Sequence, residues 1–363
     1  MIAAIFNAIT KSMRHHLIKA VLLQAAFLFP GLCQADNALP PYVFGQGLRL
    51  GDFYFSGYTN IVAEDAFGQP AKLSLDDLSV FAGGNVNRWI NPFAEVEFAK
   101  QTLIKQGGNP GHGNIVVERL YNDALVSEQD TFRLGKMLTP LGDWNTVFAS
   151  PLVPTIVRPN TTALGFETNV SGINWMHNIE NSETPDLQIY WQPDYEWFER
   201  LPRETLRHFR DVYGAHVNKS LGLIDKIGAS LQHGELVETG ENYTVLGANV
   251  MRTFGNLMLE SEALTARFYG RALPWAPPRL HNHESGIFGL ADYSITAEWH
   301  AIVEWERYQD HLVAMPSRNW LYGIDFKPQP YMVWKLEYVR QNGMPSSFSP
   351  ILTGLNCSFS TLF

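Results

Sequence analysis

The chain has few cysteines, few charged residues and no long hydrophobic run outside its N-terminal region. Its 363 residues include only two cysteines, Cys33 and Cys357, so a disulfide-rich scaffold is excluded. Charged residues make up 17% of the sequence, against about 25% in an average soluble domain. No segment after Ala35 approaches the roughly 20 apolar residues that a transmembrane helix requires. With 13% aromatic residues, this composition fits a membrane β-barrel or a large secreted β-protein.

The N-terminal residues have the composition of a secretory signal peptide. A basic start with Lys11, Arg14 and Lys19 precedes an apolar run that ends at Phe29, and the small residue Ala35 follows. The alternative, a membrane anchor, needs a longer apolar run. We therefore predict cleavage after Ala35 and export of the remaining chain.

This prediction divides the sequence into a signal peptide over residues 1–35, a periplasmic lead-in over 36–48 and a β-barrel over 49–363. Either Met1 or Met13 can be the start. Removal of the leader's three basic residues changes the net charge from −9 to −12. Nucleic-acid binding needs basic patches, so this balance argues against such a partner.

The last residues, Ile351–Phe363, alternate with period two. One face carries large apolar residues, including Leu355, Phe359 and Phe363, and the other carries small polar residues such as Ser358 and Ser360. Period two is typical of a half-buried strand. In a barrel the apolar face meets lipid and the polar face meets the lumen, and the strand pairs both with its predecessor and with the first strand near Gly51–Asn60.

The same alternation recurs along the chain, in segments separated by alternately short and long connections. Ile295–Tyr308 and Tyr331–Gln341 show it most clearly. The count is about sixteen strands with an uncertainty of roughly two. We predict an all-β fold, a single transmembrane antiparallel β-barrel of about sixteen strands with a water-filled lumen. A soluble sandwich explains each strand separately but not the whole set.

One long segment has no regular period. Leu138–Thr168 contains four prolines, and a long irregular segment in a compact fold is usually functional or disordered.

Two stretches resemble porins of Gram-negative bacteria. The terminal strand, with Phe359 and Phe363, resembles the closing strand of outer-membrane β-barrels. The stretch Phe132–Asn145, with Gly135-Lys136 and a Pro-Leu-Gly step, resembles the phosphate-selective-porin-like branch. The resemblance implies an outer-membrane barrel of sixteen strands, often trimeric, surrounded by lipid and lipopolysaccharide, whose third outer loop folds into the lumen. Phosphate selectivity is not implied, because the mature chain is acidic and lacks a lysine ladder.

The residues that we expect to line or constrict a pore lie near the long segment and on two strand faces. In or beside the segment they are Arg133, Lys136, Asp143, Arg158 and Glu167, and on the strands they are Glu95, Glu97, Glu298, His300 and Glu304. Opposed charges at a constriction select solutes by size and charge. Solvated loop and rim charges are the alternative for each of them.

Other function classes find less support. His281, His283 and Glu284 resemble a metal set but lie in a proline-rich connection, so we expect solvated side chains. Neither a Gly-x-Ser-x-Gly elbow nor a His-Glu-x-x-His pair occurs. The sequence thus predicts an outer-membrane porin for passive diffusion of small hydrophilic solutes, without cofactor or catalysis. A barrel enzyme of the lipase or protease type and an adhesin or scaffold barrel are the alternatives.

Overall fold

The computed structural model describes residues 42–147, 149–178, 184–198, 207–222, 224–276, 278–347 and 349–363. The predicted signal peptide and the first part of the predicted lead-in lie outside these residues. None of the helices among the described residues is long and apolar enough to cross a membrane.

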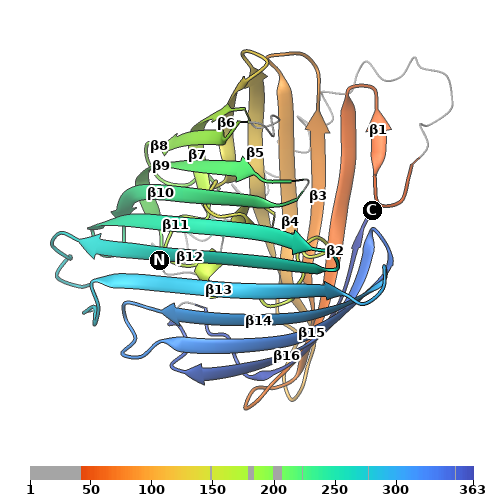
Figure 1. Ribbon diagram of the computed structural model, residues 1–363. Helices are drawn as coiled ribbons and strands as arrows, with labels where there is room; N and C mark the ends of the chain where they lie inside the picture. The colour runs from red at the N-terminus through yellow and green to blue at the C-terminus, as the bar shows by residue number, and fades with distance from the viewer. Residues whose placement is uncertain are drawn as a thin grey trace, which may run out of the picture. The chain divides into compact units, whose positions relative to one another are not determined.

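The described residues form an all-β fold (Figure 1). The strands are β1 (Leu48–Leu50), β2 (Phe53–Ala66), β3 (Lys72–Gly84), β4 (Asn91–Lys105), β5 (Asn114–Leu125), β6 (Asp130–Leu138), β7 (Asn169–His177), β8 (Asp186–Gln192), β9 (Phe209–Ser220), β10 (Lys226–Leu236), β11 (Glu241–Phe254), β12 (Leu257–Tyr269), β13 (His283–Ser294), β14 (Trp299–Gln309), β15 (Ser317–Gln329), β16 (Met332–Gly343) and β17 (Gly354–Leu362). Two short 3-10 helices, η2 (Trp144–Thr146) and η3 (Asn160–Thr162), lie between β6 and β7.

Sixteen of these strands, β2 to β17, pair in sequence order into a closed antiparallel barrel, which confirms the predicted fold class and strand count. The terminal strand closes the ring: β17 pairs with β16 on one edge and with β2 on the other. At the seam, the backbone N–H of Gly57 donates to Phe363 O and the N–H of Phe363 donates to Gly57 O. The extra strand, β1, pairs with the first residues of β2.

The two ends of the barrel differ in their connections. The turn end, where the chain finishes at Phe363, carries short connections at 85–90, 126–129, 255–256, 295–298 and 330–331. The loop end carries the longer connections 139–168, 193–208, 270–282 and 344–353.

The two faces of the barrel wall also differ, as period-two alternation requires. Along β16 the outer face shows exposed Trp334, Leu336 and Tyr338, while Lys335 and Glu337 between them are buried on the inner face. On β17 Leu355 is exposed on the outer face, and Ser358 and Ser360 are buried on the inner face, as predicted. In these strands the outer face carries exposed large apolar side chains, and the inner face carries many buried polar ones.

Several predicted strand boundaries were wrong. Residues 295–298 form a turn and not the start of β14, because the backbone N–H groups of Ile295 and Thr296 donate to Trp299 O. Residues 351–353 precede β17, and β2 continues to Ala66, beyond the predicted end at Asn60. Turn chemistry, which a period-two pattern does not record, accounts for the first of these errors.

The closed seam predicts a specific cross-link between β2 and β17. Ser360 Oγ donates to Asn60 Oδ1 at 2.8 Å, and directly opposed cross-strand Cβ atoms lie about 4.5–5.5 Å apart. With Cys357 replaced by serine, Asn60→Cys combined with Ser360→Cys should form a disulfide on mild oxidation of the folded mature chain. Counting free thiols by mass spectrometry measures this.

The matched control is Asn60→Cys with Ser358→Cys, because Ser358 pairs with Val62 and lies diagonal to residue 60. Its thiols should stay reduced. Equal cross-linking of both pairs, or of neither, would contradict the register of the seam.

Candidate functional site

The segment 139–168 between β6 and β7 starts and ends at the same point of the barrel. The N–H of Thr139 donates to Thr168 O at 2.9 Å. Asn145 strengthens this closure, because its Nδ2 donates to Thr139 O at 2.8 Å and to Thr168 O at 3.0 Å. The four prolines of the segment prevent long helices or strands. Its backbone groups must therefore find partners elsewhere.

Glu262 on the inner face of β12 supplies one such partner. Its Oε1 accepts the backbone N–H of Asp143 at 2.6 Å and that of Trp144 at 2.8 Å. Gly142 allows this approach: its φ is +69°, and a Cβ added there would lie 2.2 Å from Glu262 Oε2. One carboxylate thus caps the N-terminal end of η2, which a negative group at this position stabilises.

Other inner-face side chains do the same along the segment. Glu337 on β16 accepts the N–H of Ile156 at 2.6 Å. Glu306 on β14 accepts both the N–H of Thr161 at 2.7 Å and its hydroxyl at 2.9 Å. Gln232 on β10 accepts the N–H of Glu167 at 2.9 Å.

Lys335 provides the complementary contacts to backbone carbonyls. Its side chain is buried on β16, and its Nζ donates to Ser150 O at 2.8 Å, Val153 O at 2.6 Å and Thr155 O at 3.3 Å. Ser150 also contacts a different part of the wall, since its Oγ donates to Asp77 Oδ2 on β3 at 2.8 Å. The segment is therefore hydrogen-bonded to inner-face residues from β10 round the seam to β3.

Apolar packing accompanies these bonds. Trp144 packs edge-to-face on Phe288 of β13 with ring centroids 5.6 Å apart, in a buried cluster with Ile302, Leu321 and Val339. A second cluster places Leu141 and Phe166 of the segment against inner-face residues of β9 to β12. This packing removes apolar surface from water on both the segment and the inner wall.

The predicted residues of the segment all have partners in the described chain. Asp143 pairs with Lys226 at 3.0 Å and accepts Asn249 Nδ2 at 2.7 Å. Arg158 Nε donates to Thr162 Oγ1 at 3.1 Å, and its Nη2 donates to Asn145 Oδ1 at 2.7 Å, so Arg158 braces the segment internally. Burial raises the pKa of the Glu167 carboxyl well above its usual range, and the charge of Glu196 adds to this.

A different part of the inner wall, on β2 to β6, carries aromatic rings and charged side chains, of which Arg119, Asp123 and Arg133 are partly exposed. Arg133 forms a bidentate pair with Asp123, with both N–O distances 2.8 Å, and lies 3.8 Å from the Tyr121 ring centroid. Next to it Arg119 pairs with Glu95, and Arg119 also lies over the ring of Phe93 at 4.6 Å.

The phenylalanine and tyrosine rings of this wall continue from strand to strand. The rings of Tyr58, Phe81, Phe93 and Tyr121 follow one another with centroids 5.7, 6.1 and 5.2 Å apart. Glu97 is buried on β4 two residues after Glu95. We name the side chains of Glu95, Arg119, Asp123 and Arg133 with these rings the arginine–aromatic wall.

The remaining predicted residues separate into two groups. His300 and Glu304 lie on the inner face of β14, where His300 Nδ1 is 2.8 Å from Asp292 Oδ1. Glu298 is instead exposed in the turn before β14. Lys136 lies on the same face as its cross-strand neighbour Leu120, which is exposed on the outside, and its Nζ donates to Phe198 O at 3.1 Å. Glu298 is thus away from the segment, whereas Lys136 is buried, pairs with Glu196 at 2.5 Å, and its charge acts on Glu167 of the segment.

Sequence reasoning missed the residues that hold the segment, namely Glu262, Glu306, Glu337 and Lys335. Their alternation with apolar residues does place them on one face of a strand. No local signal, however, links a strand residue to backbone groups that are more than a hundred positions away in the sequence.

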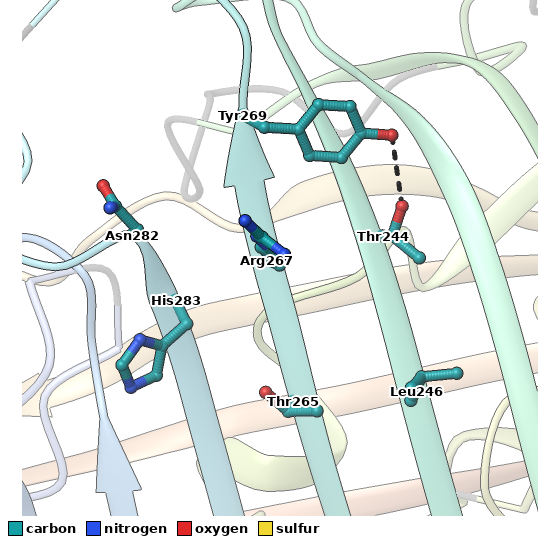
Figure 2. Close-up of a pocket in the computed structure, with 7 residues that line it drawn as sticks. All are labelled: Thr244, Leu246, Thr265, Arg267, Tyr269, Asn282 and His283. Carbon is teal, nitrogen blue, oxygen red and sulfur yellow. Dashed lines mark hydrogen bonds between the residues drawn. The ribbon is translucent and has the colours of Figure 1, made fainter.

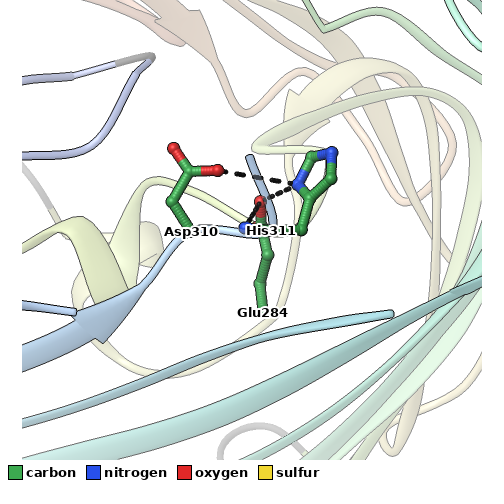
Figure 3. A group of neighbouring side chains, drawn as sticks. All are labelled: Glu284, Asp310 and His311. Carbon is green, nitrogen blue, oxygen red and sulfur yellow. Dashed lines mark hydrogen bonds and ion pairs between the residues drawn. The ribbon is translucent and has the colours of Figure 1, made fainter. Parts of the chain in front are cut away.

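Glu284, Asp310 and His311 form a buried acid–histidine group near the loop end (Figure 3). Their potential ligand atoms lie within 4.8 Å of one another. The Glu284 carboxylate, however, already accepts hydrogen bonds from Arg207 Nη1 at 2.9 Å and from the Tyr308 hydroxyl at 2.8 Å. A guanidinium in this position repels a metal cation. The group therefore fits an ion network that joins connections 193–208 and 310–316 to β13.

Loss of the Glu262 carboxylate should loosen the segment. Glu262→Ala removes two charge-assisted hydrogen bonds, each worth about 1.5–3 kcal/mol, and should speed amide exchange at Asp143 and Trp144 about tenfold or more. Glu262→Gln keeps an acceptor oxygen and should have a smaller effect. The control Glu298→Ala, in an exposed turn, should leave exchange unchanged. Hydrogen–deuterium exchange of the folded barrel measures this, and equal protection in Glu262→Ala and wild type would contradict the assignment.

Comparison with known proteins bears on the fold. No protein-family model matches the sequence, and no curated protein sequence matches it. Solved structures do match at low sequence identity. Salmonella typhi OmpF in complex with daunomycin is 10% identical, covers 86% of this chain and 97% of its own, and has a TM-score of 0.61. An anion-selective porin from Comamonas acidovorans is 11% identical, with coverages of 86% and 99% and a TM-score of 0.59.

The trimer form of OmpT, an outer-membrane protein of Vibrio cholerae, is 11% identical, with coverages of 86% and 98% and a TM-score of 0.57. At these identities the likeness concerns the fold. The resemblance to the phosphate-selective-porin-like branch stays a prediction. The described chain thus has the sixteen-stranded barrel fold found in outer-membrane porins.

Proposed function

We propose that the protein is an outer-membrane channel for passive diffusion of small hydrophilic solutes, exported by a signal peptide over residues 1–35. The observation that supports this most directly is the difference between two parts of the inner wall. The segment 139–168 is hydrogen-bonded to residues of β10 to β16 and to Asp77 on β3, whereas Arg119, Asp123 and Arg133 of the arginine–aromatic wall stay partly exposed. We infer that a water-filled passage runs between the segment and the arginine–aromatic wall.

In this proposal the segment folds into the lumen and sets the size limit for solutes. Its backbone is held by bonds to carboxylates and to Lys335, so the constriction stays in place without energy input. Solutes pass along the arginine–aromatic wall, where Arg119, Arg133 and Asp123 present hydrogen-bonding groups. Diffusion through such a pore is passive and needs neither cofactor nor metal.

The selectivity that we propose is weak. Free glutamates on the inner face would give a cation preference, but Glu262, Glu306 and Glu337 each accept backbone N–H groups of the segment. Arg119 and Arg133 are in turn paired with Glu95 and Asp123. Paired charges at a constriction favour polar solutes over apolar ones more than one ion sign over the other.

Assembly and catalysis are separate parts of the proposal. The similar structure of Vibrio cholerae OmpT is of a trimer form. For this chain we propose a homotrimer in a membrane of lipid and lipopolysaccharide. OmpT is described only as an outer-membrane protein, so the expectation that this chain is not an enzyme stays a prediction. Hydrolysis of lipid or peptide by the purified barrel would revive the barrel-enzyme alternative.

Deletion of residues 147–160 should widen the passage. Single-channel conductance in planar bilayers should rise roughly twofold or more, because the deleted stretch occupies space beside the β16 and β3 walls. The control deletes residues 271–276 from the connection between β12 and β13, at the loop end, and should leave conductance near that of wild type. Unchanged conductance after the 147–160 deletion in a folded barrel would refute the constriction.

Charge reversal on the arginine–aromatic wall should move the ion preference. Arg133→Glu leaves Asp123 without its partner, so the reversal potential in a salt gradient should shift toward cations. Arg252→Glu is the control, since Arg252 is exposed on the outer face near the turn end. If both variants shift the potential equally, the solute path does not follow this wall.

A further inference from the structure

In β12–β16 the acidic side chains lie on the inner face of the barrel, and arginines lie on the outer face. All Asp and Glu residues in these five strands are buried, and all lie on the inner face: Glu260, Glu262, Glu284, Asp292, Glu304, Glu306, Asp325 and Glu337. The exposed outer face near the loop end carries arginines instead, namely Arg267, Arg307, Arg318 and Arg340. Among the described residues no carboxylate lies within ion-pair distance of these four guanidinium groups.

Two of the arginines oppose each other directly. Arg307 on β14 and Arg318 on β15 are cross-strand partners on the outer face. Like charges directly opposite each other in a sheet are destabilising. Such a pair needs an external anion to offset the repulsion, and a phosphate matches the fork of donors that a guanidinium presents.

The position of the arginines fits the boundary of a membrane. Trp305 and Trp320 oppose each other one step closer to the turn end, with ring centroids 6.5 Å apart, and Tyr322 stacks on Trp320 at 6.2 Å. Tryptophan and tyrosine side chains mark the interface between hydrocarbon and headgroups. Arginines just beyond them lie at the level of headgroup phosphates, and in outer-membrane barrels the longer loops face the cell exterior.

A groove on the outer face of β11 to β13 is lined by one of these arginines, Arg267 (Figure 2). Its volume is about 740 Å³. Arg267, His283 and Tyr269 line it near the loop end, while Leu246 and Thr265, which are cross-strand partners, continue it toward the membrane. Only β13 lies between the strands of Arg267 and Arg307, so the two residues are two strand spacings, roughly 10 Å, apart across the sheet. Because Arg267 pairs with His283 and Arg307 pairs with Ile287, they are also offset by four residues, roughly 13 Å, along the strands.

We propose that this face binds the phosphorylated headgroup of a glycolipid of the outer leaflet, one phosphate between Arg307 and Arg318 and a second at Arg267 and His283. The groove then holds the sugar and the first part of an acyl chain. The charge complementarity selects this occupant, because the face is cationic at the headgroup level and apolar below it. The inference rests on the outer-membrane location proposed above but does not depend on conduction.

The test uses the purified full barrel in a non-ionic detergent and bis-phosphorylated lipid A as the probe. Wild type should bind lipid A, and the same glycolipid with its phosphates removed should bind much more weakly. Arg307→Gln with Arg318→Gln should raise the Kd at least about tenfold, as expected for the loss of two charge-assisted contacts. Arg252→Gln, which removes an exposed outer-face arginine near the turn end, is the matched control and should leave the Kd unchanged.

Any one of four results would overturn the proposal. An unchanged Kd in the double variant, or equal binding of the dephosphorylated glycolipid, would show that acyl packing alone is responsible. Displacement of lipid A by inorganic phosphate at equal molar concentration would assign the arginines to free anions. Dissociation of an oligomer by the double variant, with lipid A binding unchanged, would make this face a contact between copies of the chain.

Conduction separates this inference from the proposed function. The double variant should conduct like wild type, since its side chains lie on the outer face. A barrel that conducts but does not bind lipid A refutes the glycolipid site alone. A barrel that binds lipid A but never conducts refutes the channel and leaves the site in place.

Discussion

The structure depends on a constraint of backbone chemistry: a long irregular segment that packs against a barrel wall must find hydrogen-bond partners for its N–H and C=O groups. Here the wall supplies them. Glu262, Glu306 and Glu337 accept backbone N–H groups, and Lys335 donates to backbone carbonyls. Without these side chains the segment would leave polar groups unpaired at a cost of about 1–3 kcal/mol each. The proline-rich segment therefore depends on the charged side chains of the inner face for its backbone hydrogen bonds.

The same constraint changes the role of the glutamates on the inner face. Glutamates repeated along an inner face indicate a cation-attracting surface. When their oxygens accept backbone N–H groups, they act as structural acceptors and position the segment. The charges that face the proposed passage are instead those of Arg119 and Arg133, each paired with a carboxylate. On the outside the order is reversed, since β12–β16 expose arginines without nearby acids.

The sequence predicts the architecture well because every strand of a barrel shows the same alternation of inward and outward side chains. Period-two alternation identified most of the sixteen strands, and the terminal strand lies with its polar and apolar residues on the expected faces. The site was less predictable. Glu298 is in a turn that alternation could not detect, and Lys136 follows Gly135 on the opposite face from Arg133. The partners of the segment come from strands far away in the sequence, and their identity depends on the register of every strand between them.

Current through the wild-type protein tests the central claim most directly, namely that the segment held on the inner face leaves a water-filled passage. The purified mature chain is inserted into a planar lipid bilayer with different salt concentrations on the two sides. The account predicts steady, ohmic single-channel steps with a small reversal potential, because the charges along the passage are paired. Folded barrel that inserts into the bilayer without conducting would contradict it.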